Sequence, residues 1–171
     1  MTQRWAWAEV DLRALRRNVE AIVANTTTHS VWAVVKADAY GHGATECARV
    51  ALDAGAIGLC VALVDEGVAL RREGIAAPIL VMSEQPAEQH RQLVSNGLIA
   101  TVYNSESIEA LSRIAEEMNI VCAVHLKVDT GMHRVGVAPS ESVARAREVL
   151  GSPWLSLDGV YSHLEIGRAH V

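Results

Sequence analysis

Six short apolar runs, separated by longer amphipathic segments, constrain the fold of this chain more than any other feature. Runs of roughly four to eight residues are typical of strands that are buried on both faces, as the strands of a parallel sheet are. The pattern therefore predicts a parallel sheet. The runs cover residues 31–35, 57–62, 79–82, 98–102, 121–126 and 155–160.

The segments between the runs carry helix signals. Asn104 is a candidate N-cap, Pro139 is suited to the first turn of another helix, and a first helix is expected over residues 12–24. Four of the segments finish just before a glycine, where a left-handed residue commonly ends a helix. Those glycines are Gly55, Gly74, Gly97 and Gly151.

Strands that alternate with helices make β/α units with right-handed crossovers. Two architectures fit the pattern: an open, doubly wound sheet, and a TIM-like β/α barrel of eight units. The six units would complete an open sheet, whereas they would leave a barrel two units short. In either case the fold class is α/β, and 171 residues with 50% hydrophobic content suit the core of one domain.

Composition excludes several function classes. A net charge of -5 without a basic cluster argues against a nucleic-acid partner. The sequence has neither an apolar stretch of membrane-spanning length nor a signal-peptide core, so we expect no membrane association and a cytoplasmic location. Cys47, Cys60 and Cys122 are widely spaced and predict core packing rather than a disulfide or a metal site.

Polar side chains follow each of the six runs. In both architectures the carboxyl ends of the strands carry the function, so these residues are expected to share one rim. The residues are Lys36, Asp65, Glu66, Ser83, Glu84, Asn104, Lys127, Asp129, Tyr161 and His163.

Lys36 ends the first run and allows two interpretations. It is either a solvated lysine or a Schiff-base lysine, whose amine is partly desolvated and can attack an aldehyde cofactor such as pyridoxal phosphate. Gly41 and Gly43 follow within "GHG" and could let backbone donors approach a phosphate. They also resemble a dinucleotide-binding fingerprint, but Glu46 occupies the position where its third glycine belongs.

The loop "KVDTGMHRVG", residues 127–136, also has two interpretations. It is either a surface loop with an Asp129–Arg134 ion pair, or a loop that presents Arg134 as a fixed donor to a carboxylate or phenolate. Lys127 and Arg134 would repel each other if both faced one site, so one of them needs a modification or an acidic partner, for which Asp129 is the candidate. His163 is either a hydrogen-bonded bystander or part of the same site.

Three motifs resemble those of bacterial alanine racemases, which are fold-type III pyridoxal-phosphate enzymes. The motifs "VVKADAYGHG", "KVDTGMHRVG" and "YSHL" occur in the family's order, and "WAEVDLRALRRN" near the start is also similar. The resemblance covers residues 7–164. It implies a β/α barrel, a separate carboxyl-terminal β domain and a head-to-tail homodimer that supplies D-alanine for peptidoglycan.

The resemblance also implies roles for five residues. Lys36 would hold pyridoxal 5'-phosphate and act as the base on one face of the substrate α-carbon. Tyr40 would bind the cofactor phosphate, and Arg134 the phenolic oxygen and the substrate carboxylate. Lys127 resembles the family's carbamylated lysine, whose anion would orient Arg134. His163 would lie beside the cofactor ring.

Parts of the family pattern are absent from this sequence. The arginine at the pyridine nitrogen, later phosphate-binding loops and the second-base tyrosine belong to later segments of the family, so we expect the chain itself to be inactive. The last residues, "EIGRAHV", match translated sequencing-adapter DNA. We therefore predict an incomplete barrel over residues 1–164 and a non-native tail over residues 165–171, in which Arg168 and His170 have no role.

Two other functions fit the same motifs. One is a broad-specificity amino-acid racemase or a serine racemase of the same fold. The other is a non-catalytic pyridoxal-phosphate-binding protein built as a single-domain barrel, which is not expected to keep the loop at residues 127–136 in this form.

Overall fold

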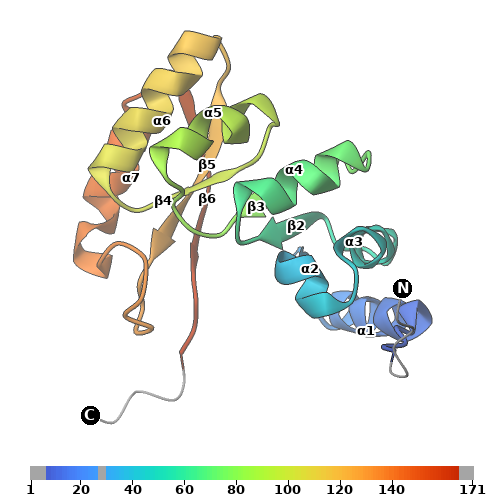
Figure 1. Cartoon of the computed structure of the whole chain (residues 1–171). Helices are drawn as coiled ribbons and strands as arrows, with labels where there is room; N and C mark the ends of the chain where they lie inside the picture. Colours follow the sequence, from blue (N-terminus) through green and yellow to red (C-terminus); the bar gives the residue numbers. More distant parts are fainter. Residues whose placement is uncertain (1–6, 27–29, 166–171) are drawn as a thin grey trace.

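The computed structural model describes residues 7–26 and 30–165, and within them it forms six parallel strands connected by helices (Figure 1). Every predicted run overlaps one strand, and the ends differ by at most two residues. The strands are β1 Trp32–Val34, β2 Gly58–Val61, β3 Ile79–Val81, β4 Ala100–Val102, β5 Cys122–Val128 and β6 Leu155–Ser162.

Helices connect successive strands and cover the outer side of the sheet (Figure 1). As predicted, the Asn104 side chain caps α6 by accepting a hydrogen bond of 2.8 Å from the Ser107 amide, and Pro139 begins a 3-10 turn. The helices are α1 Leu12–Asn25, α2 Lys36–Gly41, α3 Ala44–Asp53, α4 Val64–Arg72, α5 Ala87–Ser95, α6 Ser105–Met118 and α7 Ser142–Leu150, with the 3-10 turn η1 Pro139–Glu141.

The predicted glycine caps are correct at three of the four positions. Gly55, Gly74 and Gly97 have φ values of 105°, 81° and 57°, the left-handed region that favours glycine. The prediction is wrong for Gly151, whose φ is -74°. There the chain ends α7 without a left-handed residue, because the amides of Gly151 and Ser152 donate back to the Arg147 and Val149 carbonyls.

Strand order decides between the two architectures. The strands lie in the order β1-β2-β3 and β4-β5-β6, and every pairing is parallel. A bridge between Leu80 and Ile99 joins the two groups, since the Ile99 amide donates to Ile79 at 2.8 Å. Order in space thus follows order in sequence, as in a barrel, whereas a doubly wound sheet reverses direction at a switch point. The prediction of an incomplete β/α barrel is confirmed, and the described strands do not close into a ring.

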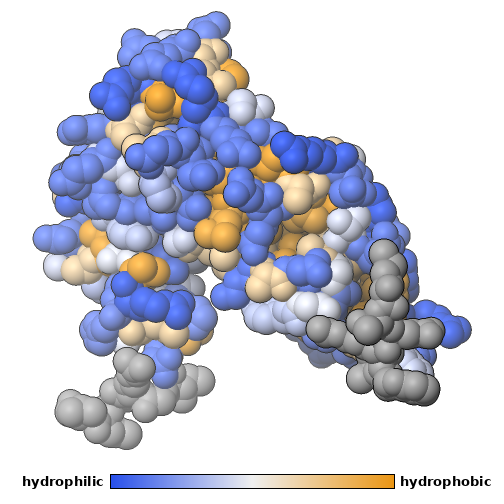
Figure 2. All heavy atoms as spheres, viewed as in Figure 1, coloured by the Kyte–Doolittle hydropathy of each residue, from blue (hydrophilic) through white to orange (hydrophobic). Residues whose placement is uncertain are grey.

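Burial follows from the open form of this barrel. The central strands β2, β3 and β4 are fully buried, but β1 and β6 at the two ends of the sheet are partly exposed. The prediction of burial on both faces is therefore wrong for β1 and β6, each of which has a neighbour on one side only, and it holds only in part for β5, where several residues are partly exposed. Figure 2 shows the apolar residues gathered in the hollow between the two halves of the molecule.

Two further predictions can be compared with the described residues. Cys47, Cys60 and Cys122 are buried and free, which confirms core packing. None of the helices in residues 7–26 and 30–165 is long and apolar enough to span a bilayer. The predicted non-native tail lies outside the described residues except for Glu165, and it stays a prediction.

Candidate active site

A cavity of about 430 Å³ lies at the carboxyl ends of the strands and brings together all five residues singled out from the sequence. Lys36 and Lys127 are the only lysines among the 171 residues, although the sequence holds thirteen arginines (15 Lys and Arg less 2 Lys). A chain that uses arginine everywhere else has thus placed both of its titratable amines in one cavity. The five, among the twelve residues that line it, are Lys36, Tyr40, Lys127, Arg134 and His163.

Lys36 opens a left-handed helical turn. The next four residues have φ between 51° and 57°, the first being Ala37 and the last Tyr40, and none of them is glycine. Each such residue costs about 1–2 kcal/mol relative to a right-handed one, so the surroundings must enforce the turn. The turn brings Tyr40 back towards Lys36, whose Nζ lies 6.0 Å from the centre of the phenol ring.

Backbone hydrogen bonds close this turn onto the end of β1. The Ala39 amide donates to the Val35 carbonyl at 2.9 Å, and the Gly43 amide donates to the Asp38 carbonyl at 2.9 Å. The Asp38 carboxylate then accepts from the Ala44 amide at 2.7 Å at the start of α3. The turn could not be predicted from the sequence, since alanine, aspartate and tyrosine rarely adopt this conformation in succession.

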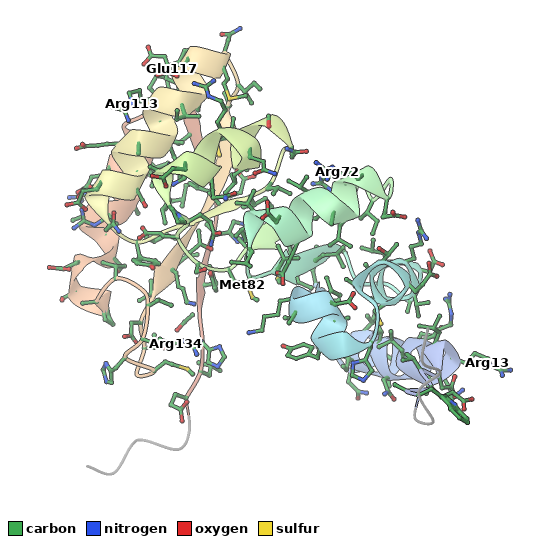
Figure 3. The ribbon with its side chains drawn as sticks, viewed as in Figure 1. Arg13, Arg72, Met82, Arg113, Glu117 and Arg134 are labelled. Carbon is green, nitrogen blue, oxygen red and sulfur yellow. The ribbon has the colours of Figure 1, made fainter. Side chains whose placement is uncertain are left out.

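The loop after β5 carries Arg134 to the cavity (Figure 3). It folds back because Val137 donates to the Lys127 carbonyl and Asp129 to the Val137 carbonyl, both at 2.9 Å. Gly136 permits the close approach: its φ is 129°, and a Cβ there would lie 2.7 Å from the Asp129 nitrogen. Arg134 is therefore held on a short closed loop rather than on a free surface segment.

Asp129 does not have the role suggested for it. Its carboxylate accepts hydrogen bonds of 3.0 Å from the amides of Gly131 and His133, and these donors hold its pKa below the ordinary value. Its ion pair in the described part of the chain is with His133, at 3.6 Å, and not with Arg134. The predicted Asp129–Arg134 pair is wrong, because the loop's own amides lie closer to the carboxylate.

Lys127 is buried, with 6% of its surface exposed. Its Nζ donates to the Met82 carbonyl at 3.4 Å, although that oxygen also accepts a 2.8 Å bond from the Tyr161 hydroxyl. Burial lowers the pKa of Lys127, and the charge of Arg134 lowers it further. An ammonium has three donors to satisfy, so this environment stabilises the charged form less than water does.

Tyr161 lies beneath the amine of Lys127, whose Nζ is 5.4 Å from the centre of its ring. The hydroxyl also lies 2.8 Å from the Thr101 hydroxyl, and burial raises the pKa of Tyr161 to about 12. A neutral phenol therefore fixes this side of the cavity. The sequence placed Tyr161 on the rim without a role, because its partners are the Met82 carbonyl and the Thr101 hydroxyl, which come from distant segments.

The geometry defines the class of the protein first. The chain is a parallel β/α barrel domain with an amine at the end of its first strand, and an arginine and a histidine line the same cavity at the carboxyl ends of the strands, where barrel proteins carry their functional sites. The family described as alanine racemase, N-terminal domain, matches residues 10–169. The chain belongs to the alanine racemase family.

Relatives support this assignment along most of the chain. The alanine racemase of Desulfosudis oleivorans is 46% identical over 168 residues, covering 92% of this chain and 43% of the relative. That of Symbiobacterium thermophilum is 43% identical and covers 94% and 43%. The chain thus spans less than half the length of these relatives.

Solved structures agree with the fold. The alanine racemase of Bacillus anthracis with bound L-Ala-P superposes with a TM-score of 0.87 at 35% identity, covering 96% of this chain and 43% of that one. The histidine racemase of Leuconostoc mesenteroides superposes with a TM-score of 0.84 at 29% identity, covering 91% and 42%.

Proposed function

We propose that this chain is the amino-terminal part of a pyridoxal-phosphate-dependent racemase that interconverts L-alanine and D-alanine. The observation that carries the proposal is the single cavity lined by Lys36, Tyr40, Lys127, Arg134 and His163. The family supports it, since the relatives named above are alanine racemases.

The donor set of the cavity fits pyridoxal phosphate. Lys36 offers a primary amine to the aldehyde, while Tyr40 and Arg134 offer donors to anionic oxygens. When bound, the cofactor supplies an electron sink for negative charge at the substrate α-carbon. His163, which directly follows β6, would lie beside the ring.

The residues of this chain then divide the work of racemisation. Arg134 orients the substrate carboxylate with its planar guanidinium, and Lys36 takes or returns the α-proton on one face. Two further groups would come from segments beyond this chain. One is the arginine at the pyridine nitrogen, and the other is the base for the second face, which the partner subunit of a homodimer would supply. The product would supply D-alanine for peptidoglycan in the cytoplasm.

Lys127 is proposed to carry a carbamate. The buried amine has a lowered pKa, which leaves it neutral more often and therefore able to react with carbon dioxide. The carbamate would be an anion beside Arg134, so the repulsion between two cations would become an attraction. This role is available to Lys127 rather than to Asp129, whose carboxylate is already engaged by its own loop.

The direct test of this function uses the full-length protein to which we propose that this chain belongs. Chiral chromatography follows the two enantiomers of alanine over time. We expect L-alanine and D-alanine each to be converted to the same mixture. Serine and histidine serve as competing substrates, because the histidine racemase shares the fold. Faster conversion of either one would support the broad-specificity or serine-racemase alternative, and cofactor binding without conversion of any amino acid would support a non-catalytic pyridoxal-phosphate-binding barrel.

Substituting Arg134 by lysine is expected to lower kcat/KM for alanine by about 10²-fold, because lysine keeps the charge but cannot orient a carboxylate through two parallel bonds. Steady-state kinetics of the full-length variant check this. Arg113→Lys, on the exposed face of α6, is the matched control and should retain the wild-type rate. An unchanged kcat/KM in Arg134→Lys would remove Arg134 from the site.

Substituting Lys127 by methionine is expected to raise the free energy of unfolding at neutral pH in bicarbonate-free buffer, because it removes a buried amine. The folded-state pKa of Lys127 lies below the ordinary value of 10.5, so the unfolded chain binds the proton more readily. Wild-type stability should therefore rise with pH between the lowered pKa and 10.5, and the advantage of the variant should shrink over that window.

Urea unfolding at several pH values measures this difference. Met82→Leu is the control, since it alters the same part of the cavity without a titratable group. If the advantage of Lys127→Met were constant with pH, the lowered pKa would be wrong.

A further inference from the structure

Glu66, on the first turn of α4, joins two separate strand ends. Its Oε1 accepts a 2.7 Å hydrogen bond from the Ala37 amide, which follows β1. Its Oε2 accepts from the amides of Ala62 at 2.8 Å and Leu63 at 3.2 Å, which follow β2. One carboxylate thus satisfies three backbone donors from two corners of the barrel.

The contact with Ala37 falls at the start of a backbone segment whose conformation is unfavourable. Ala37 is the first residue of the left-handed turn, with φ of 51° and ψ of 49°. The other hydrogen bonds described for residues 36–41 run within residues 35–44. Among the described residues, Glu66 alone reaches a turn amide from another part of the chain.

Glu66 lies outside the cavity that holds Lys36. It lines a separate small cavity with Val35 and Asp38, on the other side of the turn. No hydrogen bond or ion pair described for Glu66 reaches the amine of Lys36 or the hydroxyl of Tyr40, so its described link to them runs through the backbone of the turn.

We propose that Glu66 is a positioning residue that sets the direction of Lys36 and Tyr40. By holding the Ala37 amide, its carboxylate enforces the left-handed turn whose two ends carry the amine and the phenol. A charged acceptor suits this task, because hydrogen bonds to a carboxylate are about twice as strong as neutral ones. The consequence for cofactor and substrate rests on the proposed function; the effect on the turn does not.

Glu84 provides a matched control. It accepts hydrogen bonds from the amides of Tyr103 at 2.6 Å and Asn104 at 2.8 Å, at the corner between β4 and α6. It is the same kind of corner carboxylate on the same rim. None of its described hydrogen bonds reaches residues 36–41.

The test uses the full-length protein and compares Glu66→Ala with Glu84→Ala, each with and without Ala37→Gly. Glycine has no Cβ and adopts positive φ at little cost, so it replaces the support that Glu66 gives to Ala37. Hydrogen exchange of residues 36–41 reports the turn, equilibrium dialysis reports the affinity for pyridoxal phosphate, and kinetics separate kcat from KM.

In Glu66→Ala we expect amide exchange in residues 36–41 to become about 10-fold faster. We expect the affinity for pyridoxal phosphate to fall by a similar factor, and a tenfold change in affinity corresponds to about 1.4 kcal/mol of binding free energy. Adding Ala37→Gly should restore most of the affinity, because the turn no longer needs the carboxylate. In Glu84→Ala both readouts should stay at the wild-type values, and Ala37→Gly should restore nothing.

Unchanged exchange in Glu66→Ala, or a loss that Ala37→Gly does not restore, would overturn the positioning role. If Glu66→Ala fails to fold, Glu66→Gln carries the test. Its one amide oxygen satisfies two amides, those of Ala62 and Leu63, when it faces β2, but only one when it faces Ala37, so we expect it to leave Ala37 and to give the same loss and the same restoration. Wild-type protein that does not bind the cofactor would refute the proposed function, while the exchange of residues 36–41 would still decide the role of Glu66.

Discussion

Replacing Lys36 by alanine in the full-length protein is expected to lower kcat/KM for alanine by about 10⁴-fold or more, because it removes both the amine that holds the cofactor and the base on one face. The visible absorbance band of the bound cofactor should also disappear after dialysis. Chiral chromatography and an absorbance spectrum measure the two effects on the same preparation.

Lys36→Arg is the matched control for charge. Arginine keeps a cation at the end of β1 but is not deprotonated in proteins, so it should be as inactive as alanine. A band that persisted in Lys36→Ala after dialysis, with no amine added, would assign the cofactor to another residue.

The 171-residue chain by itself is expected to show no racemisation of L-alanine and to self-associate. Two strands at the ends of the open sheet expose apolar side chains, Val34 on β1 at 40% and Val160 on β6 at 61%. Unpaired strand edges with exposed apolar residues promote association between chains. The account also assigns the second base to a segment that this chain does not contain.

Size-exclusion chromatography and an enantiomer assay of the purified chain test this expectation. The full-length protein, assayed under the same conditions, is the control. A monomeric chain that racemised L-alanine at a rate near that of the full-length protein would contradict it, and would place both bases within these residues.

The individual strands and helices could be predicted from the sequence, but the order of the strands in the sheet could not. Each apolar run marks a strand, since a strand buried by helices needs continuous apolar residues whatever its neighbours are. The order of strands depends on contacts such as Leu80 with Ile99, which periodicity does not encode. The partial exposure of β1 and β6 likewise follows from which neighbours each strand has.

The site was predictable where a residue type reveals its chemistry. Lysines, an arginine and a histidine at strand ends are chemically informative, and the cavity brings them together. What the sequence did not reveal are the supports of the site: the left-handed turn after Lys36, the Glu66 contact with Ala37 and the Tyr161 hydroxyl on Met82. These depend on amides and carbonyls from distant segments, which every residue possesses.

Borohydride reduction of the full-length protein in the presence of pyridoxal phosphate, followed by peptide mass mapping, tests the central claim most directly. Reduction fixes the cofactor to whichever amine holds it, and the only lysines in residues 1–171 are Lys36 and Lys127. The account predicts a phosphopyridoxyl label on Lys36 and none on Lys127. A label on Lys127, or no label on either lysine, would contradict it.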